Sequence, residues 1–152
     1  MGNNLIRSGT EADFESIIDM ASNFWERTIY NEDFCEDTVQ GMLSVCLDQE
    51  LLSVVENDGV LVGFACAFKG GLLGNSAIAT GTELAWWVEP DHRGGKNGIS
   101  LLKHLEDLAA KAGIKYWNMA FMCSCMPDIV EDIYKKMGYV KSEVIYTKVL
   151  GD

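Results

Sequence analysis

The sequence lacks an apolar run long enough to cross a membrane. None of its hydrophobic stretches approaches the roughly 20 residues that a spanning helix needs, and residues 1–7 lack the basic and apolar blocks of a signal peptide. We therefore expect no membrane partner and a cytoplasmic location. Repeats, low-complexity tracts and linkers are missing too, and 152 residues are the size of one ordinary domain. The sequence predicts a single domain over residues 1–152.

Basic residues are scarce. The chain has 12 lysines and arginines against 23 aspartates and glutamates, which gives a net charge of −11. This charge repels the phosphates of nucleic acid, so we expect no DNA or RNA partner. A cationic partner or substrate fits better, although a strongly acidic balance also serves solubility alone.

Residues that bind metals are few. Five cysteines are an odd number in a chain without a secretory signal, which predicts free thiols. Cys123 and Cys125 have no partner pair and no nearby histidine, so we expect no metal site. The two histidines, His92 and His104, are expected to be solvated or to make structural hydrogen bonds.

The apolar spacing predicts a mixed α/β architecture with four helices and six or seven strands. Helices are expected at residues 10–25, 36–47, 98–112 and 128–137. Strands are expected at residues 5–7, 51–56, 60–68, 83–89 and 115–122, with one or two more within 139–150. Residues 69–82 contain four glycines and are expected to form a loop.

Local signals place several element boundaries. Thr10 followed by Asp13 is close to a capping box and predicts a helix start. Asp58-Gly59 between two β-rich runs predicts a hairpin. Gly113 occupies the position of a helix C-terminal glycine.

The most informative segment runs from a predicted strand through Pro90 and a glycine-rich turn into a helix. Unpaired N–H groups at a helix start attract anions, and glycines let a diphosphate approach the backbone. The segment therefore predicts an anion site for a nucleotide-like phosphate. Two familiar phosphate loops do not match, because Lys96 is followed by Asn97 and not by serine or threonine, and the glycine spacing differs from that of a dinucleotide fingerprint.

The run Arg93-Gly94-Gly95-Lys96-Asn97-Gly98, preceded by Val88 and Pro90, resembles the hallmark of the GNAT acetyltransferase family. A second match, Ile133-Tyr134-Lys135-Lys136-Met137-Gly138-Tyr139, lies near the C-terminus in the expected order. Two positions depart from the family pattern. Lys96 replaces the central glycine of the loop, and Pro127 replaces an asparagine that contacts the pantetheine arm.

This resemblance implies a GNAT-like fold, with a central, mostly antiparallel sheet of six or seven strands flanked by about four helices. It implies acetyl-CoA as co-substrate. The coenzyme A diphosphate would be held by the main chain of the loop, and the thioester carbonyl by a backbone N–H near Trp87 or Val88. The loop residues are Arg93, Gly94, Gly95, Lys96, Asn97 and Gly98.

The resemblance also implies two catalytic residues. Glu83 would be the base that deprotonates the amine, with a solvated strand-end glutamate as the alternative. Tyr134 would protonate the departing thiolate, with a packing tyrosine as the alternative. The side chains of Trp87 and Val88 are expected to pack in the core.

The leading hypothesis is an N-acetyltransferase in which a primary amine attacks acetyl-CoA directly in a ternary complex. The alternative is a non-catalytic acyl-CoA-binding or protein-interaction module with the same fold. The acceptor is expected to be a small molecule or a peptide, and a cationic amine would be attracted by four acids: Glu32, Asp33, Glu36 and Asp37. The hydrophobic C-terminal strands would allow two chains to pair as a homodimer.

Overall fold

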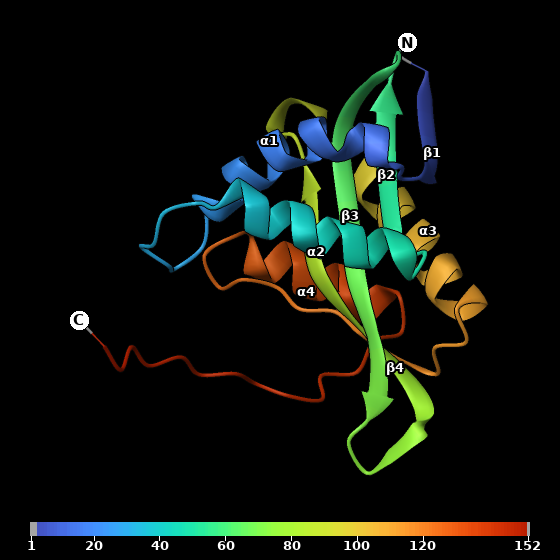
Figure 1. The fold of residues 1–152 in the computed structure, drawn as a ribbon, viewed down its shortest axis with the longest axis vertical. Coiled ribbons are helices and arrows are strands. Elements are labelled where there is room, and N and C mark those ends of the chain that lie inside the picture. The colour runs from blue at the N-terminus through green and yellow to red at the C-terminus, as the bar shows by residue number, and fades with distance from the viewer. Residues whose placement is uncertain (1–2, 152) are drawn as a thin grey trace. The chain divides into compact units, whose positions relative to one another are not determined.

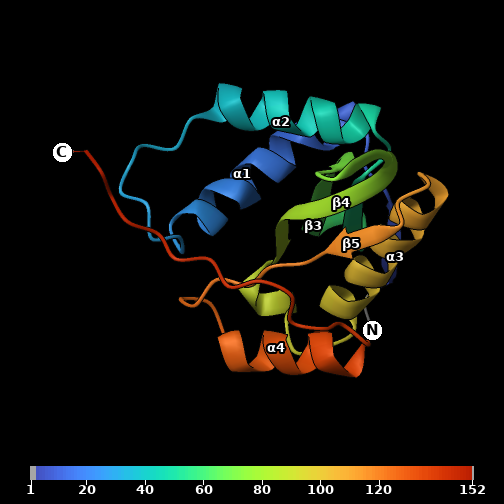
Figure 2. The same ribbon diagram turned by 90° about the horizontal axis from the view of Figure 1, so that it is seen from below.

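The computed structural model describes residues 3–151, which form two compact units, one ending at Ala120 and one beginning at Phe121. The first unit contains ten elements, and Figures 1 and 2 show their arrangement. In chain order they are β1 (Asn4–Ser8), η1 (Glu11–Asp13), α1 (Phe14–Trp25), α2 (Glu36–Asp48), β2 (Leu52–Asn57), β3 (Val60–Leu72), β4 (Asn75–Val88), η2 (Pro90–His92), α3 (Asn97–Lys111) and, completing the sheet, β5 (Tyr116–Asn118).

The sheet of this unit has the order β1-β2-β3-β4-β5. Neighbouring strands are antiparallel except β4 and β5, which are parallel. The predicted mixed, mostly antiparallel sheet is therefore confirmed. The predicted count of six or seven strands is too high, because residues 3–151 contain five.

Helix α1 begins where the sequence predicts. The backbone N–H of Thr10 donates to Oδ2 of Asp13 at 2.8 Å, which closes the capping box. Both terminal nitrogens of Arg7 on β1 donate hydrogen bonds to the same carboxylate, at 2.7 and 2.8 Å. This contact is the main cause of the lowered pKa of Asp13. The first turn is a 3₁₀ turn that continues directly into α1.

Two apolar cores lie on opposite faces of the sheet, because neighbouring strand residues point to opposite sides. Val54, Phe64 and Trp87 pack with α1 and α2, whereas Val55 and Val88 pack with α3. Figure 2 shows α1 and α2 on one side of the strands and α3 on the other. Both faces of the central strands are thus buried.

The hairpin between β2 and β3 is confirmed. Asp58 and Gly59 both have positive φ angles, of 50° and 81°. This is the conformation that a two-residue turn between antiparallel strands requires, and glycine adopts it without steric cost.

The prediction of a loop over residues 69–82 is wrong. The segment continues β3 and starts β4, and the two strands form a long ribbon that extends past the other strands in Figure 1. Glycine counts against a strand in sequence reasoning, but here it is needed for close packing. A Cβ on Gly81 would lie 2.8 Å from both Ile114 Cδ1 and Trp117 Cε3.

The second unit contains α4 (Pro127–Lys136), which begins and ends one residue before the predicted helix over residues 128–137. The one or two strands predicted within residues 139–150 do not form, and the described residues 139–151 carry no regular element. The strand predicted over residues 115–122 is also shorter, since it spans only Tyr116–Asn118. β-rich composition alone does not make a strand, because the backbone also needs a paired neighbour.

No helix within residues 3–151 combines the length and the apolar character that crossing a bilayer requires. The same residues contain no cluster of three or more histidine, cysteine or acidic side chains placed to hold a metal ion.

Candidate acetyl-transfer site

Strands β4 and β5 separate at one edge of the sheet. Their parallel ladder holds three residue pairs and ends, within the described chain, at Thr82 and Asn118. On the other side of β4, Cys66 pairs with Ala85 and Ala67 pairs with Glu83, which leaves Leu84 as an extra residue in a β-bulge. The bulge and the end of the ladder thus fall next to each other, and β-bulges often re-aim a side chain at a functional site.

Glu83 lies at this point of separation. Its side chain is half-buried, and burial raises its pKa to about 7, against a smaller lowering by the backbone N–H of Ala120. A carboxyl group with a pKa near neutrality can take up a proton at pH 7 and release it again. Glu83 therefore has the chemistry of a general base.

The glycine-rich turn leads from β4 into α3. Gly94 has a φ of +80°, and Lys96 is the N-cap of the helix that begins at Asn97. No side chain of the described residues caps this helix start. The first N–H groups of α3 therefore remain open to an acceptor, next to the positive end of the helix dipole.

Arg93 braces the turn against β4. Its Nε donates to the carbonyl oxygen of Val88 at 2.6 Å, and its guanidinium carbon lies 4.4 Å from the centre of the Trp87 ring. These contacts fix the exit from β4 through a charge-assisted hydrogen bond and a cation–π contact. They direct the Arg93 side chain along β4.

The side chains of Trp87 and Val88 are buried, as predicted for core residues. Trp87 packs edge-on against Phe24 of α1 at 6.1 Å between ring centres. Its indole N–H is buried and has no hydrogen-bond partner within residues 3–151. An unmatched buried donor is costly, so this group would gain from a bound acceptor.

Asn97 has a structural side chain. It is buried, donates through Nδ2 to the His92 carbonyl oxygen at 3.2 Å and accepts from Asn4 of β1 at 2.7 Å. The carbonyl oxygen of Gly98 accepts from Trp86 Nε1 at 3.1 Å. These bonds hold the start of α3 against the sheet.

Tyr134 belongs to α4, in the second unit. It is buried, and its ring centre lies 6.3 Å from that of Phe121 and 5.2 Å from that of Tyr139. The other predicted site residues all belong to the first unit: Glu83, Trp87, Val88, Arg93, Gly94, Gly95, Lys96, Asn97 and Gly98.

The structure agrees with a structural role for His104. Its Nδ1 lies 2.7 Å from the hydroxyl oxygen of Ser53, a fully buried residue of β2. Burial lowers the pKa of His104, so the ring is neutral at pH 7.

Sequence reasoning missed two features of the site. The bulge at Leu84 has no marker residue such as glycine, so no local pattern could have revealed it. The hydrogen bond from the Ala120 N–H to Glu83 joins β4 to a residue that follows the end of β5, and it depends wholly on the fold.

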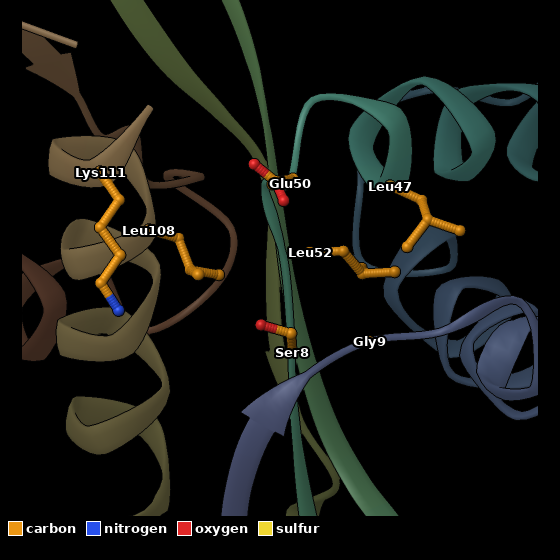
Figure 3. Close-up of a pocket in the computed structure, with 7 residues that line it drawn as sticks. All are labelled: Ser8, Gly9, Leu47, Glu50, Leu52, Leu108 and Lys111. Carbon is orange, nitrogen blue, oxygen red and sulfur yellow. The ribbon is translucent and has the colours of Figure 1, made fainter. Parts of the chain in front are cut away.

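A cavity of about 290 Å³ lies elsewhere in the first unit. Figure 3 shows Leu108 and Lys111 of α3 on one side and Leu47 and Leu52 on the other. Ser8, Gly9 and Glu50 complete its lining, and none of the predicted site residues takes part.

The sequence model of the acetyltransferase (GNAT) family matches residues 14–139, which cover parts of both units and every predicted site residue. The chain belongs to this family. The predicted family is thus confirmed, and with it the assignment to the acyltransferases. No curated protein matches this GNAT chain in sequence.

Solved structures share the fold at low sequence identity. The aminoglycoside N-acetyltransferase AAC(6')-Iy in complex with CoA superposes with a TM-score of 0.76 at 16% identity, over 99% of this chain and 97% of that one. A predicted acetyltransferase with acetyl-CoA from Clostridium acetobutylicum gives 0.76 at 16% identity, over 97% of each chain. A ribosomal-protein-alanine N-acetyltransferase from Brucella melitensis biovar Abortus 2308 gives 0.72 at 15%, over 97% and 99%. These likenesses confirm the GNAT fold.

Proposed function

We propose that this chain is an N-acetyltransferase that transfers an acetyl group from acetyl-CoA to a primary amine, with both substrates bound together. The observation that carries the proposal is Glu83, a glutamate with a pKa of about 7 where β4 and β5 separate. Direct attack needs a neutral amine, and such a carboxylate can remove the amine proton. The family match from residue 14 to residue 139 supports treating the whole chain as one acetyltransferase domain.

The turn from Arg93 to Gly98 has properties that suit a diphosphate. The helix start is uncapped, Gly94 adopts a positive φ, and no described atom lies within 4 Å of the position that a Cβ on Gly94 or Gly95 would take. A phosphate group can therefore approach the backbone closely. Lys96 is exposed beside the turn and adds a positive charge. The solved neighbours with CoA or acetyl-CoA, named above, support this choice of ligand.

Acetyl-CoA would supply the activated acetyl group as a thioester. In the proposed reaction, Glu83 accepts a proton from the ammonium form of the acceptor, which frees the lone pair of the nitrogen. A backbone N–H near Trp87 or Val88 donates to the carbonyl oxygen as negative charge develops there. Tyr134 gives its phenolic proton to the sulfur as the carbon–sulfur bond breaks. The new amide nitrogen releases its second proton to solvent, and solvent restores the proton of Tyr134.

The acceptor is proposed to be an amine on a small molecule or a peptide. The names of the solved neighbours include an aminoglycoside and a ribosomal-protein alanine as acceptors, so the fold serves chemically different amines. The net charge of −11 favours a cationic acceptor here. Cytoplasmic action remains our prediction from the sequence.

A non-catalytic acyl-CoA-binding module is the second candidate. Lys96 and Pro127 favour it, because they stand where the family pattern has a loop glycine and an asparagine. In this case the turn would still bind coenzyme A, but no amine would be acetylated.

Calorimetry with coenzyme A and a thiol-release assay across an amine library together test the proposal. We expect saturable binding of coenzyme A and release of free thiol with at least one amine class. Binding without thiol release from any amine would identify a binding module. No binding of coenzyme A would overturn both candidates.

A further inference from the structure

The cavity shown in Figure 3 lies at the opposite end of α3 from the turn of residues 93–98. Leu108 and Lys111, which line it, belong to the last turn of that helix. At 1.5 Å per residue, the 15 residues of α3 separate its two ends by about 20 Å. The cavity is therefore distinct from the candidate acetyl-transfer site, and the reaction proposed above gives it no role.

The volume of the cavity suits a small metabolite. It measures about 290 Å³. A water molecule takes up about 30 Å³ in the liquid, so about ten groups of that size fill the cavity. Pockets that hold small ligands begin at about 300 Å³. The space thus matches a compact molecule of the size of an amino acid.

Three leucines give the cavity an apolar wall. Leu47 belongs to α2, Leu52 to β2 and Leu108 to α3. Leu52 is almost fully buried, whereas the other two are half-buried. Such side chains gain free energy when an aliphatic group displaces water from them. The wall therefore fits a ligand with an aliphatic body.

Two opposite charges stand at the rim of the cavity. Glu50 lies two residues past the end of α2, and Lys111 is the last residue of α3. Both are exposed, and within residues 3–151 neither charged group has an ion-pair or hydrogen-bond partner. The hydroxyl of Ser8 is a third polar group of the lining (Figure 3). A zwitterion can thus pair its ammonium with Glu50 and its carboxylate with Lys111.

The backbone of Glu50 adopts the left-handed conformation, with a φ of 60°. Its N–H donates to the Leu47 carbonyl oxygen at 3.0 Å, and the next N–H donates to that of Cys46 at 2.8 Å. These are the two hydrogen bonds of a Schellman helix end, where glycine is the usual residue because it adopts this conformation without steric cost. A glutamate at this position lowers stability, and residues that do so cluster at ligand sites.

We propose that this cavity binds a small zwitterion with an aliphatic body, the class to which the aliphatic α-amino acids belong. Glu50 receives the ammonium group of the ligand, and Lys111 and the Ser8 hydroxyl receive its carboxylate. The aliphatic chain contacts the three leucines. Leucine is of the size that fills the cavity. The ligand would join the end of α2 to the end of α3.

Titration with leucine tests the proposal in the unaltered chain. Calorimetry should show saturable binding. Amide NMR shifts should move at Gly9, Glu50 and Leu52 and stay in place at Gly94 and Gly95. Isopentylamine and isocaproate keep the aliphatic body but carry one charge each, so they should bind about 5-fold more weakly or worse. Free glycine keeps both charges without the body and should also bind more weakly.

Charge-removing variants test the two ends of the ligand. Glu50→Gln and Lys111→Gln should each weaken leucine binding by about 5-fold or more. Glu15→Gln and Lys103→Gln are the matched controls, because they remove exposed charges of α1 and α3 that do not line the cavity. Both controls should bind leucine normally. Glu50→Gly should lose the same binding but melt at a higher temperature, since glycine suits the left-handed backbone.

The absence of saturable leucine binding up to about 10 mM would contradict the proposal. Shifts confined to the amides of residues 93–98 would contradict it too, because leucine would then occupy the candidate acetyl-transfer site. An equal loss of binding in the control variants would reduce the effect to overall charge. If a variant does not fold, the comparison of leucine with isopentylamine and isocaproate decides, since it needs no substitution. Leucine binding without coenzyme A binding would overturn the proposed function alone.

Discussion

Nε of Arg93 donates to the carbonyl oxygen of Val88 at 2.6 Å, across the turn that separates β4 from α3. The same guanidinium stacks on Trp87, the residue before Val88. A cation that the family motif places at a phosphate loop thus binds the end of the preceding strand in this structure. Arg93 therefore stabilises the conformation of the turn. We expect it to influence phosphate binding through that conformation.

Arg93→Ala should weaken coenzyme A binding by loosening the turn. Hydrogen bonds from charged groups are worth about 1.5–3 kcal/mol, so we expect roughly a 10- to 100-fold rise in the dissociation constant. Calorimetry checks this. Arg93→Lys keeps the charge but cannot reproduce both the Nε bond and the planar stack. A lysine variant that binds as tightly as the unaltered chain would show that charge alone matters.

The two glycines of the turn should respond differently to alanine. Gly94 has a φ of +80°, so Gly94→Ala should cost about 1–2 kcal/mol of folding stability or distort the turn. Gly95 lacks this constraint, and a Cβ there would meet no described atom within 4 Å. Gly95→Ala should therefore keep the melting temperature but weaken coenzyme A binding, since the methyl group blocks close approach of a phosphate. Unchanged binding in Gly95→Ala would place the diphosphate elsewhere.

Glu83→Gln should remove the base and keep the shape of the site. General bases typically contribute at least about 100-fold, so kcat should fall by that order while the affinity for coenzyme A stays unchanged. In the unaltered chain, kcat/KM should rise with pH through about 7, where Glu83 loses its proton. The rise of kcat/KM with pH near 7 should be absent in Glu83→Gln. A Glu83→Gln variant with unchanged kcat and an unchanged rise of kcat/KM near pH 7 would exclude Glu83 as the base.

The same glutamate should also shape stability against pH. Its pKa is about 7 in the folded chain, above the ordinary value of 4.5. Between these two values the unfolded chain holds fewer protons at this group than the folded one, so the contribution of Glu83 to stability is greatest below pH 4.5 and is lost as the pH rises through 7. The loss should be on the order of 1–3 kcal/mol. Denaturant unfolding at pH 5 and pH 8 should show a smaller drop for Glu83→Gln than for the unaltered chain.

Tyr134→Phe tests the proposed acid. Phenylalanine keeps the ring that lies near Phe121 and Tyr139 but has no proton to give. We expect kcat to fall by about 100-fold with little change in coenzyme A affinity. Tyr139→Phe is the matched control and should leave kcat unchanged. A large fall in melting temperature for Tyr134→Phe, with normal activity in the remaining folded enzyme, would give the hydroxyl a structural role.

The sequence by itself determined the features that depend on near neighbours along the chain. The capping box of Thr10 and Asp13, the turn at Asp58 and Gly59, and the helix start after the glycine turn each form among residues a few positions apart. Backbone sterics and helix capping act at that range, so the residues alone are sufficient to predict them.

Only the tertiary structure decided the features that need a distant partner. The ribbon over residues 69–82 exists because β3 and β4 pair there, with Gly81 packed against Ile114 and Trp117. The missing C-terminal strands show the reverse case, in which β-rich residues have no paired neighbour. Glu83 follows the same rule, since its raised pKa comes from burial at the point where two strands separate. Burial and strand pairing are contacts between segments far apart in sequence, and the fold creates them.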